Sequence, residues 1–121
     1  MLNRHDDVVR RFAAALGAGD LVALEAVIGA QAVAVCDGGG RVGAPERPVR
    51  GAHAIARLVV ALLSGQPEIR LTVEAVNGRA GLVLRRDGTA MAVVSFSVEN
   101  VKVVQLWIVL NPDKLHAWHR R

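Results

Sequence analysis

The sequence contains no tyrosine and only one cysteine. Its aromatic side chains are two Phe and two Trp. The cysteine, Cys36, cannot form a disulfide within the chain, and a chain without cross-links is typical of a reducing compartment. We expect Cys36 to pack as a small apolar side chain. No histidine stands beside it in the sequence, so a catalytic thiol would need a partner brought near by the fold, such as His53.

Long apolar runs are also missing. The longest, Leu58 to Leu63, is far shorter than the roughly 18 residues that a membrane helix needs. The N-terminus lacks the apolar segment and small-residue cleavage site of a secretory signal. We therefore expect a cytoplasmic protein that does not contact a membrane.

The composition is that of one folded domain over residues 1–121. Hydrophobic residues make up 52% and charged residues 21%, which excludes the low-hydropathy composition of a disordered chain. The net charge is +4, but the arginines are scattered and few aromatic residues lie between them, so we expect no direct DNA binding. A nucleic-acid binder is the third-ranked hypothesis.

Helical spacing of apolar residues dominates the first half of the chain. The pattern predicts a first helix from Asp6 to Leu16 and a third from Ala52 to Leu63. A second helix is expected to begin after an N-cap at Asp20, to include Ile28 in its apolar face and to end at Gly29. A short strand, Ala32 to Cys36, is expected between the second and third helices. The glycine-rich and proline-containing segment up to Arg50 is expected to be a loop.

Alternating patterns dominate the second half. Strands are expected from Ile69 to Ala75, Gly81 to Arg86, Thr89 to Val98 and Val101 to Leu110. Asn77-Gly78 and Asp87-Gly88 are typical of tight hairpin turns, and Glu99-Asn100 separates the last two strands. The predicted fold is α+β, a cone in which three helices pack on the concave face of a strongly curved antiparallel sheet, leaving a pocket.

This order of elements is similar to the nuclear transport factor 2-like cone, and two segments narrow the resemblance. They are Asp37-Gly38-Gly39-Gly40-Arg41-Val42 continuing to Arg47-Pro48-Val49-Arg50-Gly51, and Trp107 to Leu110 followed by Asn111-Pro112-Asp113-Lys114-Leu115. Together they resemble the SnoaL-like C-terminal extension of extracytoplasmic-function sigma factors, over roughly Val8 to Leu115. The sigma regions of that family are absent from this sequence, which is either a piece of a longer protein or a stand-alone relative.

The resemblance implies a domain that regulates a sigma factor in transcription initiation, by protein contacts or by a ligand in its pocket. The implied partners are sigma-factor regions, RNA polymerase core and a small apolar ligand, and a homodimer stays open. The binding or regulatory residues are expected to be Asp37, Gly38, Gly39, Gly40, Asn111, Pro112, Asp113, Lys114 and Leu115, together with Trp107 as a residue that lines the pocket. Each also has a plain structural interpretation: Asp37 pairs with an arginine in a glycine loop, the proline stops the sheet, and Trp107 is core.

An enzyme is the alternative function, a stand-alone SnoaL-like cyclase, isomerase or hydrolase acting on a small apolar substrate. Its acid–base chemistry would fall to Asp37 or His53. The absence of tyrosine removes the phenol that ketosteroid isomerases use to stabilise an enolate oxygen. For the regulatory domain we expect no catalytic residue and no cofactor. We also expect no metal, because His116 and His119 are two histidines without a third ligand.

Overall fold

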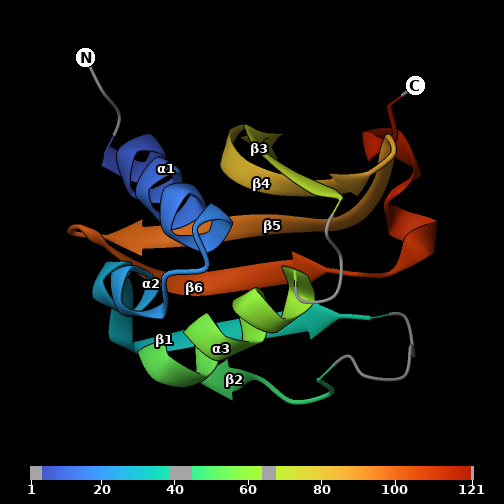
Figure 1. Ribbon diagram of the computed structural model, residues 1–121. Coiled ribbons are helices and arrows are strands. Elements are labelled where there is room, and N and C mark those ends of the chain that lie inside the picture. The colour runs from blue at the N-terminus through green and yellow to red at the C-terminus, as the bar shows by residue number, and fades with distance from the viewer. Residues whose placement is uncertain (1–3, 39–44, 64–67, 121) are drawn as a thin grey trace.

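The structure is a computed structural model that describes residues 4–38, 45–63 and 68–120. In chain order these residues form α1 (Arg4–Gly17), α2 (Leu21–Val27), β1 (Ile28–Asp37), β2 (Val49–Arg50), α3 (Ala52–Leu63), β3 (Ile69–Val76), β4 (Arg79–Arg86), β5 (Thr89–Glu99), β6 (Lys102–Val109) and two short 3₁₀ helices, η1 (Pro112–Lys114) and η2 (His116–Trp118). The three α-helices lie on one side of a curved sheet (Figure 1). The predicted α+β cone is confirmed.

Strands β3 to β6 form an antiparallel meander joined by tight turns. At the first two turns the positive φ angles fall on Asn77 (53°) and Gly78 (82°), and on Asp87 (51°) and Gly88 (79°). These are the conformations that asparagine, aspartate and glycine adopt most readily in two-residue hairpins. Both predicted hairpins are confirmed, and the third turn is centred one residue later than expected, at Asn100-Val101.

The expectation that the sheet is wholly antiparallel needs one correction. The strand order is β2-β1-β6-β5-β4-β3, and β1 runs parallel to β6. A hairpin fixes the direction of its two strands, whereas β1 and β6 are distant in sequence and no turn links them. The alternating pattern shows which face of a strand is buried but not the direction of its neighbour, so the parallel pairing was missed.

The boundary between α2 and β1 also differs from the prediction. Asp20 is the N-cap, accepting a hydrogen bond from the Ala23 amide at 3.0 Å, but Ile28 begins β1 and is not part of the helix. A Cβ on Gly29 would lie 3.3 Å from the Val103 carbonyl oxygen on β6. Glycine here therefore lets the two strands approach, and it continues a strand where a helix stop was expected.

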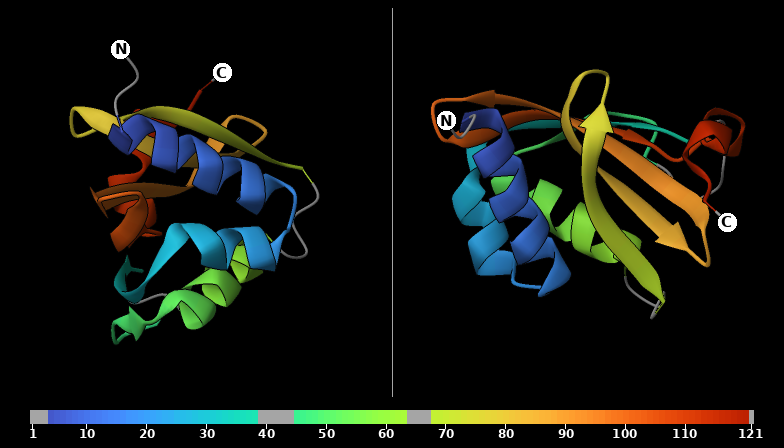
Figure 2. Two further views of the ribbon diagram at one scale, coloured as in Figure 1. Left: turned by 90° about the vertical axis from the view of Figure 1, so that its left-hand side faces the viewer. Right: turned by 90° about the horizontal axis from the view of Figure 1, so that it is seen from above.

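The main core fills the concave side of the sheet, where the helices face it (Figure 2). Phe12 of α1 meets Phe96 of β5 edge to face, with ring centroids 5.0 Å apart. Ile55 of α3 and Leu106 and Ile108 of β6 have no exposed surface. Each such side chain contributes roughly 1.5–3 kcal/mol of burial free energy, so this face holds the helices to the sheet.

A second, smaller core lies on the outer, convex face. It consists of Val76, Val83, Ala90, Val93 and Leu115, with Val109 and Trp118 packed against it. Residues 112–120, here called the C-terminal strap, fold back over β3, β4 and β5 to cover it. The loop expected up to Arg50 ends in the two-residue strand β2, which pairs with Val33 and Ala34 of β1.

Candidate functional site

The two signature segments meet at one end of the sheet. Because β1 and β6 are parallel, their final residues lie side by side, Asp37 opposite Val109. The Asp37 carbonyl oxygen accepts hydrogen bonds from the Leu110 amide at 2.8 Å and the Asn111 amide at 3.0 Å. The Lys114 Nζ donates to Asp37 Oδ2 at 2.5 Å. Asp37, Asn111 and Lys114 thus form one structure, called the junction site below.

Local chemistry holds Lys114 in this position. Pro112, at the start of η1, has no N–H to lose and a fixed φ that suits a helical turn. The Asn111 side chain caps that turn by accepting from the Asp113 amide at 3.1 Å. Lys114 then closes it, donating its amide to the Asn111 carbonyl at 3.0 Å. The Asn-Pro-Asp-Lys order therefore turns the chain so that the lysine returns to Asp37.

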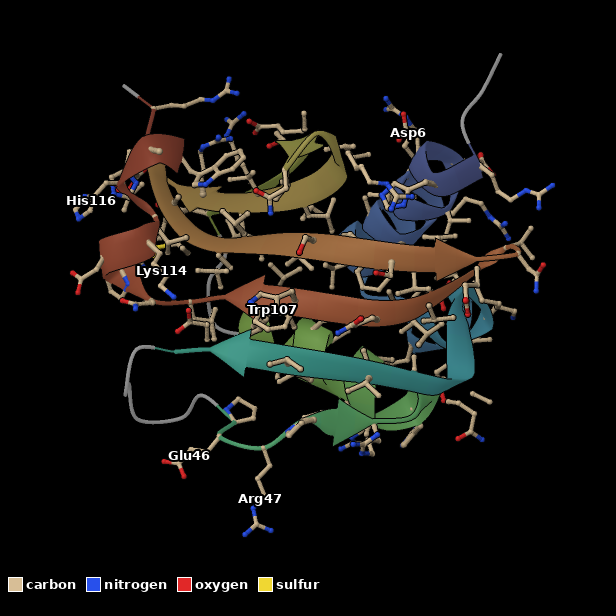
Figure 3. All side chains as sticks on the ribbon, turned by 180° about the vertical axis from the view of Figure 1, so that it is seen from behind. Asp6, Glu46, Arg47, Trp107, Lys114 and His116 are labelled. Atoms are coloured by element: carbon tan, nitrogen blue, oxygen red, sulfur yellow. The ribbon has the colours of Figure 1, made fainter. Side chains whose placement is uncertain are left out.

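The junction site is open to solvent on the lysine side. The side chain of Lys114 is 61% exposed and that of Asp37 is 24% exposed. An ion pair this exposed contributes little to stability, typically 0.2–1 kcal/mol. Its charges are available to a partner, and Lys114 lies at the surface of the molecule (Figure 3).

Two predicted site residues have other surroundings than expected. Trp107 is 47% exposed, whereas its neighbours Leu106 and Ile108 are fully buried. It therefore lies on the outer face of β6 (Figure 3) and neither lines the inside of the cone nor belongs to the core. Leu115 is only 2% exposed, so it anchors the strap and offers a partner almost no surface. Gly38 is buried, and Gly39 and Gly40 lie outside the described residues.

Asp37 and His53, the two alternative acid–base residues of the enzyme hypothesis, lie in different parts of the fold. His53 Nδ1 lies 3.0 Å from Glu25 Oε1 on α2, and Gly51, just before it, donates to the carbonyl of Ala32 in the middle of β1. Asp37 lies five residues further along that strand, roughly 16 Å away at the rise of an extended chain. Cys36 has its pKa raised by burial, so it is a thiol rather than a reactive thiolate.

Sequence reasoning missed a charged network on the outer face. Arg85 on β4 is buried and donates to Glu74 on β3 through Nη1 at 2.5 Å and Nη2 at 3.1 Å. Its Nε donates to the Trp118 carbonyl at 2.8 Å, and Arg120 donates to Glu74 at 2.7 Å. These bonds fasten the strap to the sheet. The signal was Glu74 alternating with apolar residues in β3, since a carboxylate on a partly covered face needs a cationic partner.

The hydrogen bonds from Arg85, opposed by burial and assisted by Thr72 and Arg120, lower the pKa of Glu74 from 4.5 to about 2. The carboxylate is therefore ionised at neutral pH. Within residues 4–38, 45–63 and 68–120, no group of three or more histidine, cysteine, aspartate or glutamate side chains is arranged to hold a metal ion. Across the same residues, no helix is long and apolar enough to cross a membrane.

The chain is similar in sequence to the extracytoplasmic-function RNA polymerase sigma factor SigJ of Mycobacterium tuberculosis. The identity is 32% over 124 residues, which cover 91% of this chain and 38% of SigJ. The crystal structure of SigJ superposes with a TM-score of 0.72 at 27% identity, covering 95% of this chain and 45% of that one. The chain thus spans less than half the length of this relative. No family model matches it.

More distant structures share the fold. A nuclear transport factor 2-like protein of unknown function from Cytophaga hutchinsonii superposes at a TM-score of 0.62 and 13% identity, covering 95% of this chain and 96% of that one. An epoxide hydrolase from M. tuberculosis superposes at 0.56 and 16% identity, covering 96% and 89%. The chain therefore has the SnoaL-like, nuclear transport factor 2-like fold and is similar in sequence to the extracytoplasmic-function sigma factor SigJ.

Proposed function

We propose that this domain regulates an extracytoplasmic-function sigma factor through protein contacts made at the junction site. The observation that carries the proposal is the meeting of the two signature segments, Asp37 and Asn111 to Lys114, in one exposed structure. The sequence similarity to SigJ supplies the class of partner, namely sigma-factor regions or RNA polymerase core.

The chemistry of the junction site favours contact over catalysis. A general base must reach its substrate with a free lone pair and a tuned pKa. Asp37 is instead paired with the Lys114 ammonium, so its carboxylate is already engaged by a charged side chain of the same chain. An exposed lysine and aspartate at the rim of an interface set partner choice and association rate, which is what a regulatory contact requires.

The enzyme alternative is supported by fold likeness to the epoxide hydrolase, which is an argument from fold alone. The pairing of each alternative acid–base residue with another side chain, Asp37 with Lys114 and His53 with Glu25, counts against it. A small apolar ligand inside the cone stays a prediction. The apolar side chains between the helices and the concave face of the sheet are the chemistry that such a ligand would need.

The test uses charge reversal at the junction site. We expect Lys114→Glu to weaken binding to the sigma regions of SigJ and to RNA polymerase core by at least tenfold, because it reverses a charge that faces the partner. The melting temperature should hardly change, since the side chain is exposed. Fluorescence titration and thermal melting measure the two effects.

A charge-swapped double variant separates the fold from the contact. Asp37→Lys together with Lys114→Asp keeps opposite charges in the junction site but exchanges their positions. We expect stability close to that of the wild type with binding still weakened. Arg11→Glu on α1, an exposed charge reversal away from the junction site, is the matched control. Wild-type binding by both junction variants would refute this role.

A further inference from the structure

The strand β3 has one edge that no other described strand covers. It pairs with β4 along eight consecutive residues, Ile69 to Val76, without a bulge, and it is the last strand of the sheet. Proteins usually protect such an edge with a proline, a bulge or a lysine, because its free amides and carbonyls recruit another strand. The strand has none of these three protections, although it carries Arg70 and Glu74 and α1 packs beside it. Figure 2 shows β3 at the margin of the sheet, with α1 beside it.

The hairpin turn determines which backbone groups face outward. Val76 and Arg79 flank the two-residue turn, so they form a hydrogen-bonded pair, and every second residue back along β3 does the same. The amides and carbonyls of Thr72 and Glu74 therefore point at β4. Those of the alternate residues, Ile69, Leu71, Val73 and Ala75, point away from the sheet.

We propose that β3 binds β3 of a second copy of this chain in an antiparallel pair, with the two-fold axis at Thr72. In this register Leu71 lies opposite Val73 of the second copy, and Ile69 lies opposite Ala75. All four are residues whose backbone groups face outward. The two sheets then become one continuous sheet across the dimer.

Charge selects this register over its neighbours. With the axis at Thr72, Arg70 lies opposite Glu74 of the second copy, twice by symmetry. An axis at Leu71 places Glu68 opposite Glu74, and an axis at Arg70 or at Glu74 places like charges opposite each other. An axis at Val73 places Arg70 opposite Val76 and so forms no opposite-charge pair. Opposite charges directly across a strand pair stabilise it and like charges destabilise it.

Arg70 lacks an opposite charge across from it in its own β3–β4 pair. Within its own chain it lies opposite Arg85 in the β3–β4 ladder, which is a like-charge neighbour. Glu74 already binds Arg85 and Arg120, so the added pair selects the register rather than supplying most of the binding energy. That energy comes from the backbone hydrogen bonds and from the apolar residues between them.

The register predicts a specific cross-link. Thr72 faces its own copy in a non-hydrogen-bonded pair, with Cα atoms roughly 4.5 Å apart, within the range that a disulfide spans. In a Cys36→Ala background, Thr72→Cys should therefore form a covalent dimer with oxidised glutathione. Arg70→Cys, which faces Glu74 of the second copy, should form at least tenfold less. Equal cross-linking of the two variants, or none at Thr72→Cys, would overturn the register.

A backbone test checks the edge itself. Ala75→Pro removes one outward-facing amide and no bond to β4, so the fold should persist while dimerisation weakens at least tenfold. Ala75→Ser keeps the amide and should dimerise like the wild type. Sedimentation of the isolated chain measures both variants without any sigma factor, so the outcome is independent of the proposed function. A wild-type chain that stays monomeric at all concentrations would refute the proposal.

Discussion

Glu74 shows how one side chain ties the chain's last residues to its sheet. Its carboxylate accepts from Arg85, Arg120 and Thr72, and the pKa falls to about 2 mainly through the bond from Arg85. A carboxylate whose pKa is lowered on folding stabilises the native state above its unfolded pKa. That contribution is lost as the pH falls toward the folded value, between about pH 5 and pH 2.

We expect Glu74→Gln to lower the free energy of unfolding at pH 7 by about 2 kcal/mol, because it leaves the buried Arg85 without its anionic partner. The difference from the wild type should shrink as the pH falls toward 2, since the native carboxylate is then protonated as well. Urea unfolding at several pH values measures it. A difference that stays constant with pH would contradict the assigned ionisation.

The C-terminal strap differs most from what the sequence predicted. The sequence segment Asn111 to Leu115 predicted a contact surface, and the structure divides it into an exposed part and an anchor. Lys114 is exposed, whereas Leu115 inserts into the outer core beside Val83 and Val93. The Asn111–Leu115 segment therefore combines an exposed lysine with a buried leucine that holds the segment on the sheet.

Leu115→Ala should accordingly destabilise the protein by about 2–4 kcal/mol, because it empties a buried site on the outer face. Lys114→Ala, one residue away and exposed, removes only the ion pair with Asp37 and should cost less than about 1 kcal/mol. Thermal and urea unfolding of the two variants compares them directly. Equal stability of the pair would show that the strap does not pack on the sheet as described.

Sequence reasoning found the elements whose signals are local. The Asp20 cap and the turns at Asn77-Gly78 and Asp87-Gly88 depend only on neighbouring residues. The parallel contact of β1 with β6 joins residues 72 to 75 positions apart, and the bond from Lys114 to Asp37 joins residues 77 positions apart. No local pattern encodes either contact. Trp107 was misplaced because strand alternation defines two faces without telling which one is covered.

In the whole molecule, the residues that we propose for regulation lie on the outer surface of the cone. The helices and the concave face form the main core, while the junction site is solvent-exposed and Trp107 lies on the outer face. Part of the positive charge is neutralised within the chain, since Glu74 pairs with Arg85 and Arg120 and Asp37 pairs with the exposed Lys114. A surface of this kind suits a protein partner better than a row of phosphates.

The most direct test titrates the wild-type chain against three partners at physiological salt: the sigma regions of SigJ, RNA polymerase core and a random-sequence DNA duplex. We predict saturable binding to at least one of the protein partners at concentrations at which the duplex shows none. Nanomolar affinity for the duplex with a steep dependence on salt, together with no binding to either protein, would contradict the account.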